Sequence, residues 1–108
     1  MEYRTLGRTG LEVSVIGLGT EYLPGQLGEA VGSVIREAIE QGVNYFDLVF
    51  SFPDYLDNLG SALQGHRECV VLTGHLGSTE QNGQYRKSRN PKKSEQVFRE
   101  LLTRLNTS

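Results

Sequence analysis

The 108-residue sequence is poor in the residues that mark specialised protein classes. It has one cysteine, three prolines and no tryptophan, and 11 Lys and Arg against 13 Asp and Glu give a net charge of -2. A single cysteine, Cys69, excludes an intramolecular disulfide and a cysteine-ligated metal cluster. We expect it to be buried or half-buried, because an apolar run follows it.

Long hydrophobic runs and an excess of basic charge are also lacking. No run approaches the ~20 apolar residues of a membrane span, and the first residues do not resemble a signal peptide. A net charge of -2 gives no electrostatic reason to expect nucleic acid or a lipid surface as a partner. We therefore expect a cytoplasmic protein.

Glycine, by contrast, is abundant, and the thirteen glycines separate short apolar segments. Residues 3–6 and 11–14 flank a turn from Gly7 to Gly10, which predicts a β-hairpin. The pattern then predicts three βα units, with strands at 15–20, 43–47 and 69–73 and helices at about 29–41, 54–64 and 94–105. Repeated βα units imply parallel strands, either in a doubly wound open sheet or in a (β/α)8 barrel.

Residues 74–93 are polar and show no periodicity, so we expect a long loop. Its basic run, residues 86–93, is interpreted as solvated rather than as a phosphate-binding patch. Ser94 is the expected N-cap of the last helix.

The segment Gly17-Leu18-Gly19-Thr20 raises the question of a nucleotide-binding loop. A dinucleotide fingerprint needs a third glycine three places after the second, and Tyr22 stands there, so we reject that motif. The glycines would still allow a ligand to approach the backbone closely at a strand end.

Together these motifs resemble the opening of an aldo-keto reductase. The stretch from Tyr3 to Ser14 reads Tyr-Arg-x-Leu-Gly-x-Thr-Gly-Leu-x-Val-Ser, and Gly17-Leu18-Gly19-Thr20 follows it. The block from Phe46 to Gly60 aligns without a gap with the family's Phe-Asp-Thr-Ala-x-x-Tyr-Gly-x-Ser-Glu-x-x-Leu-Gly. Residues 70–73 and 101–107 fit the next strand and the helix after it.

The resemblance covers almost the whole chain and implies the α/β class and a (β/α)8 TIM barrel. Such barrels need roughly 250 residues, so this chain would supply the N-terminal β-hairpin and about three of the eight βα units. We therefore expect residues 1–108 to be an incomplete, N-terminal fragment of a single barrel domain.

In function, the resemblance implies hydride transfer between a nicotinamide cofactor, NADP or NAD, and a small-molecule carbonyl substrate. In the family a tyrosine donates a proton, a lysine lowers the pKa of that tyrosine, and an aspartate pairs with the lysine. Asp47 matches the aspartate, but Phe52 stands at the tyrosine position. Gly74 follows the strand threonine, where the lysine is expected. The family's histidine, from the fourth strand, would lie beyond residue 108.

Asp47, Gly19 and Thr20 are the expected cofactor-binding residues, and Asp47 is also a catalytic candidate. The alternative for Asp47 is a structural acid that accepts hydrogen bonds from backbone N–H groups. His75 is the candidate substitute acid, because histidine exchanges protons near neutral pH; the alternative is a loop histidine bonded to backbone. Tyr22 and Tyr55 are expected to pack rather than to donate protons, and no metal site is expected.

Two functions therefore stay open: part of a nicotinamide-dependent oxidoreductase, or a non-catalytic half-barrel or interaction module. Three parallel strands leave two unpaired edges. Val70 and Leu72 are expected to face the missing wall of the barrel, so we expect self-association. The segments from Asp47 to Pro53 and from Gly74 to Ser78 resemble a divergent branch, some members of which carry a ferredoxin-like iron–sulfur segment after the barrel.

Overall fold

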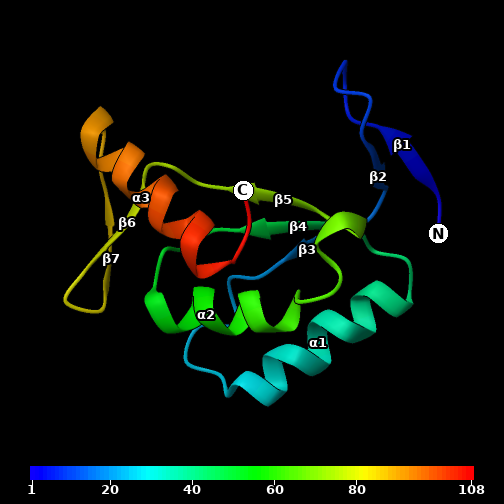
Figure 1. Cartoon of the computed structure of the whole chain (residues 1–108), viewed down its shortest axis with the longest axis horizontal. Helices are drawn as coiled ribbons and strands as arrows, with labels where there is room; N and C mark the ends of the chain where they lie inside the picture. Colours follow the sequence, from blue (N-terminus) through cyan, green and yellow to red (C-terminus); the bar gives the residue numbers. More distant parts are fainter.

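The first residues form the predicted hairpin. In the computed structural model, which describes all 108 residues, β1 (Tyr3–Thr5) pairs antiparallel with β2 (Glu12–Ser14). Gly7 and Gly10 adopt φ values of +54° and +77° in the turn, which glycine permits without steric cost. The hairpin stands at one end of the molecule, beside the N-terminus (Figure 1).

Three parallel strands follow and form the central sheet. They are β3 (Leu18–Gly19), β4 (Tyr45–Leu48) and β5 (Val71–Gly74), in the order β3-β4-β5. The first strand is shorter than the predicted 15–20, because only Leu18 and Gly19 pair with β4. The sheet is not closed, so β3 and β5 are both edges.

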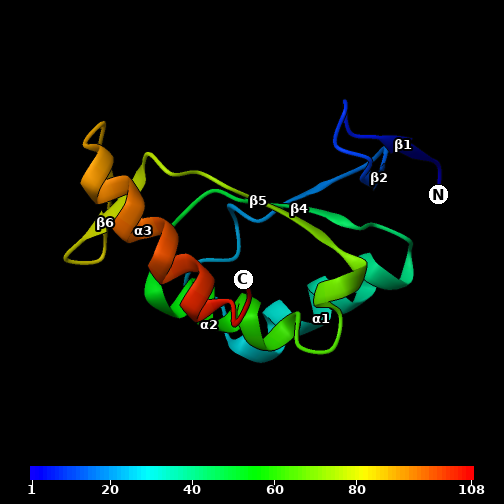
Figure 2. The ribbon, with the colours of Figure 1, turned by 45° about the horizontal axis from the view of Figure 1, so that its top comes forward.

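Helices cover one face of this sheet (Figure 2). They are α1 (Gly28–Glu40), α2 (Pro53–Ala62) and α3 (Pro91–Arg104), as the apolar spacing predicted to within a few residues. Gly42, at φ +90°, ends the first βα unit and allows the chain to turn back into β4. The core lies between the helices and the sheet and includes Val31, Ile35, Phe46, Leu48, Leu56, Leu59, Leu101 and Leu105.

The strand register corrects the expected orientation of two apolar residues. Phe46 on β4 is buried under the helices, and Leu72 pairs with it in parallel register, so Leu72 packs against the same core. Val70 is also a member of that core. The prediction that Val70 and Leu72 face a missing barrel wall is therefore wrong, because strand residues alternate faces and these two lie on the helix side.

The exposure of Cys69 also differs from the prediction, which was a buried or half-buried thiol. Cys69 ends a short 3-10 helix, η1 (Arg67–Cys69), that precedes β5, and it is exposed. Because residues 67–69 form this 3-10 helix, β5 begins at Val71, two residues later than predicted.

The segment expected to be a long loop contains a second hairpin. β6 (Ser78–Gln81) and β7 (Gln84–Lys87) pair antiparallel through a turn at Asn82 and Gly83, whose φ values are +53° and +78°. Positive φ at both central residues is the signature of a tight hairpin turn. This hairpin lies at the end of the molecule opposite β1 and β2 (Figure 1).

The last helix begins earlier than predicted. Asn90 is its N-cap and accepts hydrogen bonds from the backbone N–H groups of Lys92 and Lys93, while Pro91 takes the first helical position. Ser94 lies inside the first turns, so its assignment as the N-cap is wrong. None of the three helices is both long and apolar enough to cross a membrane.

Candidate functional site

The carboxyl ends of the parallel strands bring the main predicted residues together. Asp47 on β4 pairs in register with Gly19 on β3 and with Thr73 on β5. Because Phe46 and Leu48 point into the helix layer, the side chain of Asp47 points to the opposite face of the sheet. In (β/α)8 barrels this end of the strands carries the active site.

Asp47 and His75 form a pair at this end of the sheet. The Nε2 atom of His75 lies 2.6 Å from Oδ1 of Asp47, and the two side chains are 41% and 38% exposed. The pair is therefore open to a ligand from solvent. The expected alternatives, a carboxylate held by backbone N–H groups and a histidine bonded to backbone, are not seen, since each side chain has the other as its partner.

Gly74 does not face Asp47. It pairs with Leu48, whose side chain is buried under the helices, and a Cβ atom at Gly74 would lie 3.2 Å from Cδ1 of Leu101 on α3. A longer side chain at position 74 would point toward α3, whereas the next residue, His75, reaches Asp47. The geometry therefore does not support Gly74 as the position that holds a partner of Asp47.

Thr20 is fully buried and joins β3 to β4. Its backbone N–H and its hydroxyl both donate to the carbonyl oxygen of Asp47, at 3.1 and 2.7 Å, and its hydroxyl also bonds the hydroxyl of Tyr55. Its expected contact with a cofactor stays a prediction. In this structure Thr20 fixes the backbone that carries Asp47.

Tyr55 is a core residue, as predicted, and Tyr22 is not. Burial raises the pKa of Tyr55, the hydrogen bond with Thr20 lowers it, and the nearby charge of Asp47 adds a smaller rise. Because Tyr55 lies in the core and keeps its phenol neutral, its role is packing rather than proton donation, as predicted. Tyr22 is 85% exposed, so the prediction that it packs is wrong.

Glu21 is a residue at this edge that the sequence did not single out. A Cβ atom at Gly19 would come within 2.5 Å of Oε2 of Glu21, so the carboxylate lies directly over the Gly19 backbone. A side chain at position 19 would therefore displace the flexible end of Glu21. A ligand that approaches the Gly19 backbone would have to displace Glu21.

Phe52 belongs to an aromatic cluster at the start of α2. Its ring centroid is 5.1 Å from that of Phe50, and Phe50 lies 6.1 Å from Tyr55 and 5.6 Å from Tyr85 of the second hairpin. The cluster is joined to the core and anchors β6 and β7 to the rest of the molecule. Phe52 therefore has a packing role and offers no proton.

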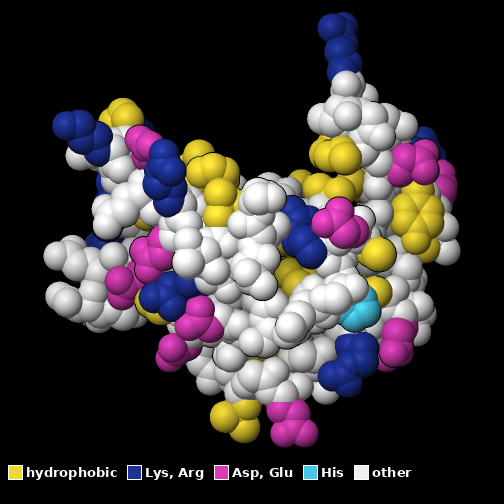
Figure 3. Space-filling model, in the orientation of Figure 1, with side chains coloured by type: hydrophobic (Ala, Val, Ile, Leu, Met, Phe, Trp, Pro, Cys, Tyr) yellow, Lys and Arg dark blue, Asp and Glu magenta, His cyan; other side chains and the backbone are white.

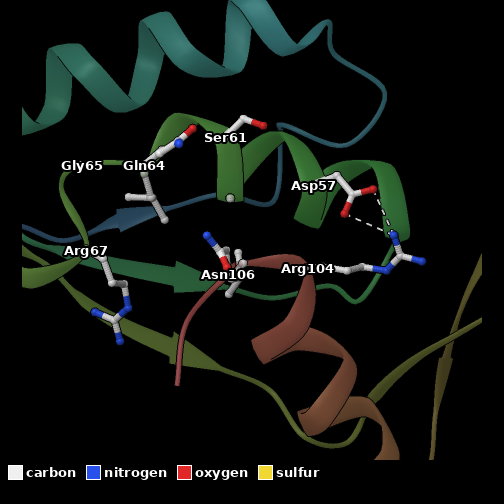
Figure 4. Close-up of a pocket in the computed structure, with 10 residues that line it drawn as sticks. Asp57, Ser61, Gln64, Gly65, Arg67, Arg104 and Asn106 are labelled. Carbon is white, nitrogen blue, oxygen red and sulfur yellow. Dashed lines mark hydrogen bonds and ion pairs between the residues drawn. The ribbon is translucent and has the colours of Figure 1, made fainter.

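A separate polar pocket of about 410 Å³ lies between α2 and the end of α3 (Figure 4). Arg104 bonds Asp57 there at 2.9 Å and Glu100 at 3.1 Å, and these two carboxylates raise the pKa of the guanidinium. The lining includes neither Asp47 nor His75. We interpret this pocket as a structural contact between two helices rather than as part of the site.

Comparison with known proteins supports the similarity seen in the motifs. The chain is 31% identical over 111 residues to an uncharacterized oxidoreductase, YqkF, of Bacillus subtilis (strain 168), covering 99% of this chain and 36% of the relative. No protein-family model matches the chain.

The chain is also similar to solved structures, which give the same picture as this relative. The crystal structure of PA4992 from Pseudomonas aeruginosa, provisionally assigned as an aldo-keto reductase, matches with a TM-score of 0.85 and 28% identity. A second aldo-keto reductase structure from that organism, with the same provisional assignment, matches with a TM-score of 0.80 and 27% identity. Each match covers 97% of this chain and 42% of the other, so the chain spans well under half the length of these relatives. The resemblance to the aldo-keto reductases is thereby confirmed, while the expectation that residues 1–108 are the N-terminal part of one barrel domain stays a prediction.

Proposed function

We propose that this chain forms the N-terminal part of a cytoplasmic, nicotinamide-dependent oxidoreductase that interconverts small carbonyl compounds and alcohols. The observation that carries the proposal is the Asp47–His75 pair, at the carboxyl ends of two adjacent parallel strands. Residues 1–108 would belong to one barrel domain, with the remaining strands of the site supplied by further βα units.

The residues at the strand ends fit the nicotinamide end of NADP or NAD. The exposed carboxylate of Asp47 can accept hydrogen bonds from ribose hydroxyls, and Gly19 offers backbone without a side chain once Glu21 moves aside. Thr20 would keep the Asp47 backbone in place. When bound, the cofactor supplies the hydride.

We further propose that His75 stands in the place of the family's lysine as the partner of Asp47. Its Nε2 atom is held by Asp47, which fixes the orientation of the imidazole and leaves Nδ1 without a protein partner. Nδ1 can therefore hold a proton and donate it to a carbonyl oxygen at the mouth. Such a role would replace the tyrosine, since Phe52 has no proton to give.

Cofactor-dependent carbonyl reduction tests this proposal. In a protein that carries this chain and binds the cofactor, His75→Ala should lower the rate of NADPH oxidation with a carbonyl panel by about 10²-fold or more. His75→Lys should retain an ion pair with Asp47, whereas a matched His75→Ala/Gly74→Lys variant should not, because residue 74 points at Leu101. Circular dichroism checks that each variant is folded.

A protein that neither binds NADPH or NADH in a fluorescence titration nor reduces any carbonyl of the panel would exclude the enzymatic proposal. That outcome would favour a second candidate, a non-catalytic half-barrel or interaction module. The unpaired edges of β3 and β5 are the observation in its favour. The intact mass of the natural protein separates the two, because the enzyme requires further βα units and the module does not.

A further inference from the structure

We infer that a hollow beside His75 binds an anionic group, the carboxylate of a carbonyl substrate. The hollow has a volume of about 320 Å³ and is open to solvent. It is lined by His75, Gly77, Ser78, Tyr85, Lys87, Ser88 and Arg89. This inference names the substrate class of the proposed oxidoreductase and, for that assignment, rests on the proposed function.

The fold selects two members of the basic run for this hollow. On β7, Tyr85 and Lys87 lie on one face of the strand, and Arg86 lies on the other, where it bonds Gln84 at 3.3 Å. Lys92 and Lys93 lie in the first turn of α3, outside the hollow. Lys87 and Arg89 are therefore brought to His75 by the second hairpin, which the sequence pattern did not predict.

The two cations have no carboxylate partner in the protein. The five ion pairs of the structure join Arg4, His75, Arg99 and Arg104 to acids, and neither Lys87 nor Arg89 takes part in any of them. No Asp or Glu lines the hollow. Two unpaired cations that line one hollow without an acid favour an oxyanion ligand, and a guanidinium can bind a carboxylate through two parallel hydrogen bonds.

The frame of the hollow is fixed by backbone bonds. The N–H of Ser78 donates to the carbonyl oxygen of His75 at 3.1 Å, and the N–H of Ser88 donates to that of Gly77 at 3.0 Å. The first bond closes a turn within the segment after β5, and the second ties that segment to the segment after β7. The hairpin thus sets the backbone positions from which His75 and the two basic side chains reach the hollow.

The position of the hollow favours the substrate over the cofactor as the source of the anion. His75 lines it, and His75 is the proposed proton donor to the carbonyl, whereas Gly19 and Asp47 do not line it. In a 2-oxo acid the carboxylate is bonded directly to the carbonyl carbon. Such a ligand can place its carbonyl near His75 and its carboxylate near Lys87 and Arg89.

Binding of three probes to the 108-residue chain, followed by amide chemical shifts in NMR, tests the inference. Pyruvate should give saturable shifts at Gly77 and Ser88, and butanone, a neutral carbonyl of similar size, should not. Lys87→Gln and Arg89→Gln should each weaken pyruvate binding roughly fivefold, the upper end expected for an exposed ion pair. Lys92→Gln removes the same charge from outside the hollow and should leave binding unchanged.

Three results would overturn the inference. The first is a pyruvate response no larger than that of butanone, and the second is an equal loss of binding in Lys92→Gln and Arg89→Gln. The third is displacement of pyruvate by inorganic phosphate at lower concentration, since this would make the cofactor's phosphate the better source of the anion. Reduction is measured in the protein that carries this chain together with its further βα units. Pyruvate binding without any NADPH-dependent reduction by that protein would contradict the proposed function and leave the anion site standing, and reduction of butanone without any pyruvate binding would do the reverse.

Discussion

Tyr55 is the titratable side chain among the buried residues of the core. Burial raises its pKa, so the folded chain holds the phenolic proton more tightly than the unfolded chain does. A pKa that is raised on folding adds stability that is complete below the unfolded value, about 10, and is lost as pH rises through the folded value. The folded state should therefore weaken at alkaline pH.

The first prediction concerns this residue. The free energy of unfolding, measured with a denaturant from neutral pH to about pH 11, should fall at the alkaline end, and Tyr55→Phe should flatten the fall. The variant also loses the hydrogen bond with Thr20, which should cost about 1 kcal/mol at neutral pH. Tyr22→Phe, at an exposed position, is the control and should change neither quantity. If the free energy of unfolding of Tyr55→Phe fell at alkaline pH as steeply as that of the unchanged sequence, the fall could not be assigned to Tyr55.

Part of the site could be predicted residue by residue. Asp47 follows from its place at the end of an apolar strand, and His75 from its nearness to the next strand end. Whether position 74 or 75 faces Asp47 could not be decided, because that depends on where β5 begins after the short helix η1. The position of Glu21 over Gly19 is a tertiary contact without any local pattern.

At the level of elements, the apolar helices were predictable and the second hairpin was not. Apart from Tyr85, residues 78–81 and 84–87 are polar, so no alternation of apolar residues marks these strands. The local signal that could have found the hairpin is Asn82-Gly83, a dipeptide favoured in two-residue hairpin turns. Likewise, Asn90-Pro91 marks the start of α3 better than Ser94 does.

The N-cap of α3 gives the second prediction. Asn90→Ala removes two hydrogen bonds, of 3.0 and 3.4 Å, from the first turn of the helix and should lower the free energy of unfolding by about 1 kcal/mol. Ser94→Ala makes the same kind of change inside the helix and should cost less than about 0.5 kcal/mol. Denaturant unfolding of both variants measures the difference. If Ser94→Ala proved the more damaging change, the observed helix start would be wrong.

On the scale of the whole molecule, the chain buries little. Only 16 of its 108 residues are buried, and the sheet has two free edges, so the molecule resembles a barrel wall without its opposite side. A groove beside β5 and α3, about 350 Å³ in volume, has seven hydrophobic residues in its lining. Leu76 and Phe98 stand in this groove at 47% and 44% exposure. Figure 3 shows hydrophobic side chains on both flanks of the notch above this region.

These features lead to the last prediction, that the isolated 108-residue chain self-associates. Unpaired strand edges and exposed apolar surface are both stabilised by contact with a second copy, at about 25 cal/mol for each Å² of apolar surface removed from water. Light scattering should therefore give a mass above 12.0 kDa that rises with concentration. Leu76→Lys/Phe98→Lys should reduce association, because it places charge in the groove beside β5. Leu27→Lys, at a 78% exposed position before α1, should not reduce it. A single monomeric species with a cooperative thermal transition would show that the open sheet is stable by itself.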